Sequence, residues 1–207
     1  MSQGKMRIDI STFKRTGGLR MPGSIHEDTG LRSMEVDNID TFQKEDARIP
    51  GIAKEAALEE YEEKRDFEKT KEPTPNEERA IQDGDRFVVQ KHDASKLHYD
   101  FRLEADGVLK SWAVPNMDKI ATEEKGKVLA VETEDHPVDY IDFSGEIPEN
   151  EYGGGTVEIW DSGSYKTLEH EGDKWTFSLD GKKLKGKFTL LKPKSSDDWL
   201  FVRGKNE

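Results

Sequence analysis

The 207-residue sequence contains no cysteine, which excludes disulfide bridges, thiolate metal sites and a cysteine nucleophile. It also contains no apolar run long enough to cross a membrane. The N-terminus lacks the apolar centre of a secretory signal. These absences predict a cytoplasmic protein without membrane association.

Apolar residues and positive charge are also scarce. Hydrophobic residues make up 32% of the chain and charged residues 37%, a ratio that predicts disorder in part of it. The formal net charge of −12 argues against extensive electrostatic binding to the phosphates of a nucleic-acid backbone. It leaves room for an enzyme that contacts a few phosphates through a local basic pocket and a metal ion.

Composition divides the chain into a polar N-terminal part and a strand-rich part. Residues 1–50 show scattered glycine and charge without a sustained period, and we expect a disordered tail there. We expect residues 51–207 to form one domain. A helix is predicted from Ile52 to Phe67, where helix-forming residues run without glycine or proline before the prolines of KTKEPTP.

Short runs of β-branched and aromatic residues, separated by turn signals such as Ala-Asp-Gly, follow from residue 86 onward. This pattern predicts a mainly β fold, a compact antiparallel β-barrel of about eight strands with short flanking helices. A closed sheet has no exposed edges and can carry a polar site inside. The predicted strands are RFVVQKH, HYDFRLEA, LKSWAVP, KVLAVETE, GTVEIWD, WTFSLDG, GKFTLLK and WLFVRG.

The segment QKHDASKLHYDFRL carries the strongest chemical signal. Side chains alternate faces in a strand, so His98, Asp100 and Arg102 share one face. A divalent cation would satisfy the imidazole and the carboxylate, with His92 as a third ligand, and Arg102 would clamp a phosphate beside it. A solvated strand face is the alternative, since His-x-Asp-x-Arg is a weak pattern by itself.

A second segment, ETEDHPVDY, places His136 at the end of a strand, before a proline. An imidazole there could donate a proton to a leaving oxygen or stabilise charge on a phosphate, and Tyr140 could add a hydrogen bond. A histidine that merely caps a turn is the alternative. The run Gly153–Gly155 lacks the spacing of a phosphate-binding loop and predicts a bend between strands.

These segments belong to longer strings that resemble the 3′-phosphoesterase module of bacterial ligase D, the end-joining DNA ligase, and its stand-alone archaeal and bacterial relatives. The resemblance runs from about Leu58 to Lys205. It is carried by KRDFEKTKEP, RFVVQKHDASKLHYDFRLEADGVLKSWAVP, LAVETEDHPVDYIDFSGEIPENEYGGGTVEIWD and WLFVRGK.

The resemblance implies a DNA 3′-end-healing enzyme. Such an enzyme removes a 3′-terminal ribonucleoside as a phosphodiesterase and then the 3′-phosphate as a phosphomonoesterase, leaving a 3′-hydroxyl. It implies manganese as the cofactor, with Zn²⁺ or Co²⁺ as alternatives. The implied substrates are DNA or RNA-tipped DNA 3′ ends. We expect a ligase, polymerase or end-binding protein to act in trans, and we expect the protein itself to be a monomer.

The resemblance also implies roles for single residues. The metal ligands would be His92, His98 and Asp100. Three residues would surround the scissile phosphate, namely Arg102, His136 and Tyr140. Five would support the active site, namely Gln90, Glu134, Arg65, Asp66 and Glu72.

Two positions depart from the family's pattern. Asn116 and Val128 stand where family members often carry lysine and arginine, which predicts a weakened phosphomonoesterase step. Two other functions stay open. One is a cupin-like metal oxygenase, which would use the same ligand types. The other is a non-enzymatic DNA-end or protein-binding module that stacks its partner on Trp112, Trp160, Trp175 and Trp199.

Overall fold

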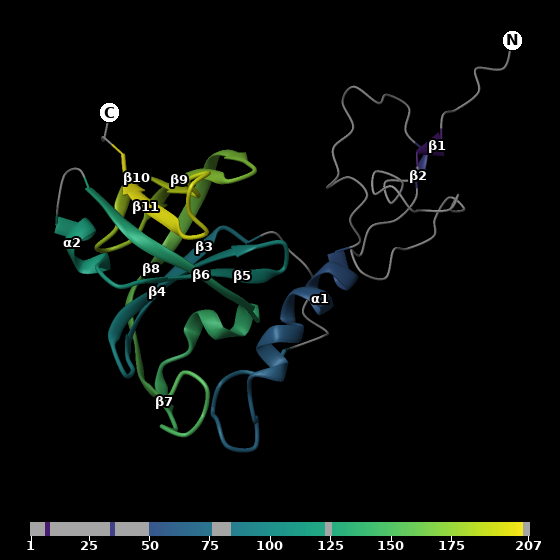
Figure 1. Cartoon of the computed structure of the whole chain (residues 1–207), viewed down its shortest axis with the longest axis vertical. Coiled ribbons are helices and arrows are strands. Elements are labelled where there is room, and N and C mark those ends of the chain that lie inside the picture. Colours follow the sequence, from purple (N-terminus) through teal and green to yellow (C-terminus); the bar gives the residue numbers. More distant parts are fainter. Residues whose placement is uncertain (1–6, 9–33, 36–49, 76–83, 123–125, 205–207) are drawn as a thin grey trace, which may run out of the picture. The chain divides into compact units, whose positions relative to one another are not determined.

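The computed structural model describes residues 7–8, 34–35, 50–75, 84–122 and 126–204 (Figure 1). The chain divides into two compact units, residues 1–57 and 58–207. In the first unit, β1 (Arg7–Ile8) pairs antiparallel with β2 (Met34–Glu35), and α1 (Pro50–Glu63) runs across the division. The predicted disordered tail falls almost wholly outside the described residues and stays a prediction.

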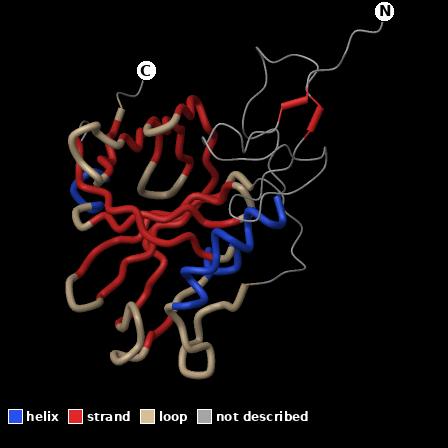
Figure 2. Tube along the Cα trace, turned by 45° about the vertical axis from the view of Figure 1, so that its right-hand side comes forward, coloured by secondary structure: helices blue, strands red, loops and turns tan. Residues whose placement is uncertain are grey.

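Eight strands of the second unit close into an antiparallel barrel (Figures 1 and 2). Their order is β3-β4-β5-β6-β11-β10-β9-β8, and β8 pairs back with β3. Each coincides with one predicted segment, so the predicted barrel is confirmed. The strands are β3 (Arg86–Asp93), β4 (Leu97–Ala105), β5 (Val108–Val114), β6 (Gly126–His136), β8 (Gly155–Glu171), β9 (Lys174–Asp180), β10 (Lys185–Leu191) and β11 (Trp199–Arg203).

Aromatic side chains fill the interior of the barrel. Phe101 of β4 lies at the centre, with its ring centroid 5.7 Å from that of Phe177 and 4.8 Å from that of Phe201. Each fully buried ring of this kind stabilises the fold by roughly 1.5–3 kcal/mol. Three of the four tryptophans, Trp112, Trp175 and Trp199, are buried in the same cluster, and Trp160 packs against it. Trp112, Trp175 and Trp199 are therefore core residues and do not form an exposed stacking surface, whereas Trp160 is partly buried.

The polar face of β4 points away from this interior. Tyr99, Phe101 and Leu103 belong to the core cluster, so Asp100 and Arg102, between them in the alternation, lie on the outer face of the barrel. The apolar face of β4 thus packs into the core, which its pattern suits, and the polar face lies outside the barrel interior. Closely packed aromatic rings occupy the interior, where a row of charged groups would be costly to bury.

A second apolar cluster covers part of the outer face. The 3₁₀-helix η3 (Val138–Asp142), β7 (Gly145–Ile147) and the end of α1 pack there, below the barrel in the view of Figure 1. The cluster joins barrel residues to residues of these flanking segments. Its members are Tyr61, Val88, Leu109, Tyr140, Ile141, Phe143, Ile147 and Val157, with Phe67 against it.

The predicted helix ends earlier than expected, at Glu63 and not at Phe67. The Arg65 amide donates to the Glu62 carbonyl, and the amides of Lys69 and Thr70 donate to the Asp66 carbonyl. These tight turns redirect the chain across the outer face of the barrel. The short elements α2 (Met117–Thr122), η3 and β7 were not predicted, because each is too brief to show a period.

No helix among the described residues is both long enough and apolar enough to cross a bilayer.

Candidate metal centre and active site

Three side chains on the outer face of β3 and β4 converge on one point. His92 pairs directly with His98 across the two strands, and Asp100 follows two residues further along β4. The nearest Asp100 carboxylate oxygen lies 3.5 Å from His92 Nδ1, and the other lies 3.5 Å from His98 Nε2. One potential ligand atom from each residue lies within 4.8 Å of the other two.

Backbone carbonyls fix the orientation of both imidazole rings. His92 Nε2 lies 2.7 Å from the Gly153 carbonyl oxygen, and His98 Nδ1 lies 2.8 Å from the Lys96 carbonyl oxygen. A carbonyl only accepts, so these two nitrogens carry the protons. The other two nitrogens, His92 Nδ1 and His98 Nε2, face Asp100 and are the ones that would bind a metal ion. This is the arrangement in which neutral histidines bind metal ions.

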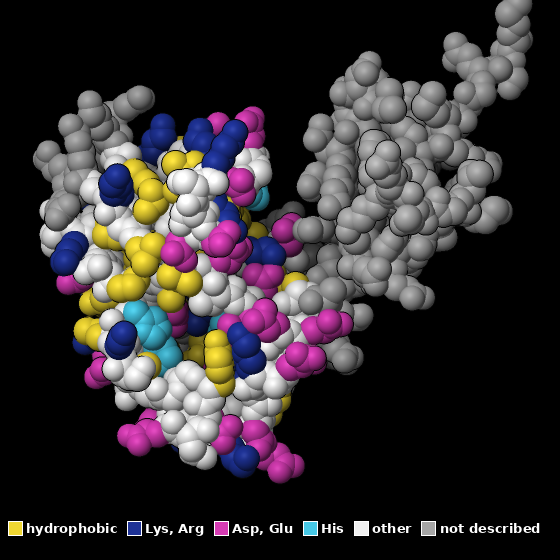
Figure 3. Space-filling model, viewed as in Figure 1, with side chains coloured by type: hydrophobic (Ala, Val, Ile, Leu, Met, Phe, Trp, Pro, Cys, Tyr) yellow, Lys and Arg dark blue, Asp and Glu magenta, His cyan; other side chains and the backbone are white. Residues whose placement is uncertain are grey.

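The spacing of the three groups fits a cation of ordinary size. Ligand atoms that each lie about 2.1 Å from one ion stand roughly 3–3.5 Å apart. The two separations of 3.5 Å involve different Asp100 oxygens, and the three ligand atoms lie within 4.8 Å of one another, so a shared ion would draw the side chains closer together. His92 and Asp100 are buried, whereas the His98 side chain is 25% exposed, so the point of convergence is open on one side. Figure 3 shows histidine side chains on this face, beside a hollow bordered by basic and acidic side chains.

Arg102 joins this centre to the rest of the polar cluster. Its Nη2 donates to Asp100 Oδ2 at 3.2 Å, its Nε to Gln90 Oε1 at 2.8 Å, and its Nη1 to Ser111 Oγ at 2.8 Å. Burial raises the pKa of Asp100, but the Arg102 guanidinium lowers it, and the resulting pKa lies below its ordinary value. Asp100 is therefore ionised at neutral pH and ready to bind a cation.

His136, the last residue of β6, lies between two guanidinium groups. Its Nδ1 is 2.8 Å from the Glu134 carbonyl oxygen and 3.0 Å from Arg102 Nη1, and its Nε2 is 3.2 Å from Arg65 Nη2. The carbonyl needs a donor and Arg65 needs an acceptor, so we assign the neutral tautomer protonated at Nδ1. Arg102 Nη1 is then not bonded to His136, and it donates to Ser111 Oγ instead. Burial, together with Arg102 and Arg65, holds the pKa of His136 well below its ordinary value.

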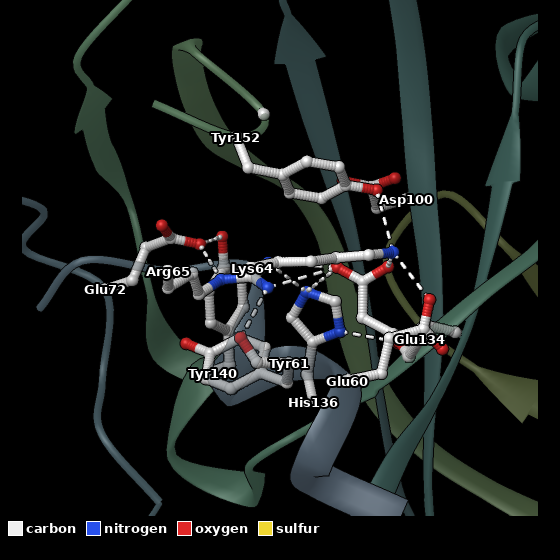
Figure 4. Close-up of polar contacts among 12 residues, drawn as sticks. Glu60, Tyr61, Lys64, Arg65, Glu72, Asp100, Glu134, His136, Tyr140 and Tyr152 are labelled. Carbon is white, nitrogen blue, oxygen red and sulfur yellow. Dashed lines mark hydrogen bonds and ion pairs between the residues drawn. The ribbon is translucent and has the colours of Figure 1, made fainter. Parts of the chain in front are cut away.

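Arg65 sits at the centre of a buried network of charges, shown in Figure 4. Its Nε donates to Glu72 Oε1 at 2.9 Å, and its Nη1 donates to Glu134 Oε1 at 3.2 Å. Lys64 Nζ contacts the other Glu134 oxygen at 3.2 Å and Glu60 Oε1 at 2.6 Å. Removing one member of such a buried pair leaves an uncompensated charge, which typically costs about 3–5 kcal/mol.

Tyr140 and Gln90 hold the network against η3. The Tyr140 hydroxyl donates to Glu72 Oε1 at 3.0 Å, and burial raises the pKa of Tyr140 well above its ordinary value. Tyr140 therefore remains a phenol and a donor. Gln90 Nε2 donates to the carbonyl oxygens of Tyr140 and Phe143, at 3.1 and 2.9 Å, while its Oε1 accepts from Arg102.

Comparisons with known proteins point to one family. A profile of the family described as the DNA Ligase D 3′-phosphoesterase domain matches residues 90–192. The chain is 46% identical, over 158 residues, to the multifunctional non-homologous end joining protein LigD of Pseudomonas aeruginosa. It is 39% identical, over 193 residues, to the multifunctional non-homologous end joining DNA repair protein LigD of Mycobacterium tuberculosis.

The chain belongs to the DNA ligase D 3′-phosphoesterase domain family. The two matches cover 72% and 87% of this chain, respectively. The chain spans 19% of the length of the Pseudomonas protein and 25% of that of the Mycobacterium protein.

Most residues that the resemblance to this family pointed to lie together in the structure. Asp66 does not. Its side chain is 40% exposed, forms an ion pair with Lys69 and accepts from the Glu68 amide. The two departures from the family's pattern make other contacts. Val128 packs against the barrel core, and Asn116 precedes α2 and accepts the Lys119 amide.

Sequence reasoning missed several members of the phosphoesterase site. Ser111 binds Arg102, with which it pairs across β4 and β5, so a correct strand register would have found it. Tyr61 lies four residues before Arg65, and the Arg65 guanidinium carbon is 3.8 Å from the centroid of the Tyr61 ring. Lys64 and Tyr152 gave no signal, because nothing in the local pattern joins residues so distant in sequence.

Gly155 keeps the end of β3, and with it His92, in place. Its φ is +144°, and a Cβ there would collide with the Asp93 carbonyl oxygen and lie 2.8 Å from Ala94 Cα. We expect Gly155→Ala to lower the free energy of unfolding by about 2–3 kcal/mol. We also expect weaker Mn²⁺ binding by isothermal titration calorimetry, because His92 would shift.

Gly172→Ala is the matched control. Gly172 also has a positive φ, +50°, but nothing lies within 4 Å of an added Cβ. The free energy of unfolding of this variant should fall by only about 1–2 kcal/mol, the usual cost of a left-handed conformation for a residue with a side chain. Its affinity for the metal should not change. Equal losses in stability and metal affinity for the two variants would contradict the role given to Gly155.

The neutral state of His136 should make stability depend on pH. Unfolded histidine has a pKa of about 6.5. The folded pKa is well below this value, so below about pH 6.5 the unfolded chain binds a proton that the folded chain does not. Stability from His136 is therefore present above that pH and is lost as the pH falls, by up to about 1.4 kcal/mol per unit.

Urea unfolding in the presence of a chelator, between pH 7.5 and 5, measures this dependence. His136→Gln, which cannot titrate, should give a flatter curve than the wild-type protein. Parallel curves would show that His136 is not held neutral in the folded state.

Proposed function

We propose that this chain is a divalent-metal-dependent phosphoesterase that processes the 3′ ends of DNA during end joining. It would remove a 3′-terminal ribonucleoside and then the remaining 3′-phosphate, leaving a 3′-hydroxyl. The observation that carries the proposal is the pair of carbonyl-anchored imidazoles facing Asp100, with Arg102 on the same carboxylate. Family membership and the names of the relatives support the DNA-end substrate.

His92 Nδ1, His98 Nε2 and the Asp100 carboxylate would hold the cation, with Mn²⁺ as the proposed ion and Zn²⁺ or Co²⁺ as alternatives. A bound cation would withdraw charge from a non-bridging phosphate oxygen and favour attack by water. Three protein ligands leave coordination positions for substrate and water.

The chain's own residues would orient the phosphate. The Arg102 guanidinium lies 3.2 Å from the Asp100 carboxylate, so it could donate hydrogen bonds to a second oxygen of a phosphate bound at the metal. Gln90 and Ser111 fix its plane from Nε and Nη1. Tyr140 packs edge-on against His136, with ring centroids 4.7 Å apart, and lies under Arg102. The phosphate would thus meet a rigid guanidinium whose rotamer is already fixed.

His136 would respond to the charge of the substrate. Two guanidiniums keep it neutral in the free protein, and a phosphate anion would offset their effect and raise its pKa. The resulting imidazolium would donate to a phosphoryl oxygen or to the leaving oxygen. In the first reaction, a water oxygen bonds to phosphorus, the bond from phosphorus to the 5′-oxygen of the terminal nucleoside breaks, and that oxygen takes up a proton.

Two observations weigh against the other functions considered. A metal oxygenase would also use two histidines and a carboxylate. Here, however, Arg102 and Arg65 both flank His136, which favours a substrate with several anionic oxygens. A non-enzymatic module with tryptophan platforms is disfavoured because Trp112, Trp175 and Trp199 are buried. A ligase, a polymerase or an end-binding protein as a partner remains part of the proposal, since the relatives are named as multifunctional end-joining proteins.

Loss of a metal ligand should abolish both reactions. We expect His98→Ala and Asp100→Ala to reduce Mn²⁺-dependent cleavage by at least a thousandfold, because the phosphate would lose its main source of charge withdrawal. Cleavage is measured on a ribonucleotide-tipped primer and on a 3′-phosphate primer. Calorimetric titration with Mn²⁺ gives a second readout that is independent of turnover.

His170→Ala and Asp93→Asn are the matched controls. His170 is exposed and stacks on Trp175, and Asp93 is exposed at the end of β3. Both variants should keep wild-type affinity and activity. Activity of His98→Ala or Asp100→Ala within tenfold of wild type would contradict the ligand assignment.

A further inference from the structure

The loop between β7 and β8, residues 148–154, places an aromatic side chain at the rim of the proposed active site. Tyr152 is 48% exposed, whereas Tyr61 and Tyr140 of the same site are buried in the second apolar cluster. The next residue, Gly153, contributes the carbonyl oxygen that binds His92 Nε2 at 2.7 Å. The position of Tyr152 is therefore tied to a proposed metal ligand.

Two cations hold one face of the Tyr152 ring. Lys64 Nζ lies 4.7 Å from the ring centroid and donates to the Tyr152 hydroxyl at 3.3 Å, and the Arg65 guanidinium carbon lies 5.6 Å from the centroid. Figure 4 shows Lys64 between Tyr152 and His136. Glu134 anchors both cations in turn. The ring is thus fixed in orientation before any ligand arrives.

This arrangement is unlike that of a tyrosine that stabilises the core. Almost half of the side chain is in solvent, and its recorded side-chain contacts are with the two cations. A fixed ring that is half exposed beside a phosphate site offers a surface for another flat, polarisable group. A nucleobase is such a group, and stacking on an aromatic side chain tolerates any base because each has a π-face.

We propose that Tyr152 is the platform on which the base of the 3′-terminal nucleoside stacks, so that it favours the nucleoside-removing step. The proposal rests on the proposed function. The terminal base has one face without a stacking neighbour, and a single ring can cover only one such face. Removal of a 3′-phosphate has no base on the leaving side, so Tyr152 contributes little to that reaction.

A cycle of protein and substrate changes tests the proposal. Three substrates share one primer and template: a normal 3′-terminal ribonucleoside, an abasic ribose at the same position, and a 3′-phosphate. Wild-type protein should lose about tenfold in kcat/KM when the base is removed. Tyr152→Ala should lose about tenfold on the normal terminus and little more on the abasic one. It should remove the 3′-phosphate within about twofold of the wild-type rate.

Tyr152→Phe keeps the ring and should retain the preference for a base. Leu168→Ala, a change at another exposed side chain, on β8, should match wild type on all three substrates. Thermal unfolding and Mn²⁺ titration of each variant check that the fold and the metal site are intact.

Two results would overturn the role of Tyr152. One is an equal slowing of all three reactions by Tyr152→Ala, which would mean that the ring only shields Lys64 and Arg65. The other is a wild-type protein that cleaves normal and abasic termini equally well. Absence of any Mn²⁺-dependent cleavage by wild-type protein would instead overturn the proposed function itself.

Discussion

The antiparallel register of β3 and β4 is the constraint on which the site depends. It places His92 opposite His98, Gln90 opposite Asp100 and Val88 opposite Arg102, all on the outer face of the barrel. A slip of one residue would turn one strand's polar side chains into the aromatic interior. The core therefore enforces the register, because Tyr99, Phe101 and Leu103 must face inward.

Beside the three proposed metal ligands, the site contains a network of buried charged side chains, whose burial costs free energy. Arg65, Arg102, Glu72 and Glu134 are buried, and each is paired with an opposite charge. Burying such groups is unfavourable unless their hydrogen bonds are satisfied, and here carboxylates, amides and hydroxyls satisfy them. The arrangement fixes the two guanidiniums around His136 before substrate binds. Buried ion pairs add little to the stability of a fold, but guanidiniums held in place can stabilise an anionic phosphoryl group.

Much of this arrangement could be predicted from the sequence, because period-2 alternation is a local property. It identified the eight barrel strands and the shared face of His98, Asp100 and Arg102. It also separated the apolar face of this strand, which suits a core, from its polar face. The convergence of Lys64, Arg65 and Tyr152 escaped prediction, because it depends on where α1 ends and where the loop after β7 returns. Asp66 follows Arg65 in the chain, but its side chain points to solvent.

The central claim is that two carbonyl-anchored imidazoles and one carboxylate hold a single cation. Anomalous diffraction from crystals soaked in Mn²⁺ tests it most directly, because it locates the ion and identifies the coordinating nitrogens. We expect one strong peak about 2.1–2.3 Å from His92 Nδ1, from His98 Nε2 and from an Asp100 oxygen. A peak elsewhere, or an ion bound through His92 Nε2 after rotation of the ring, would contradict it.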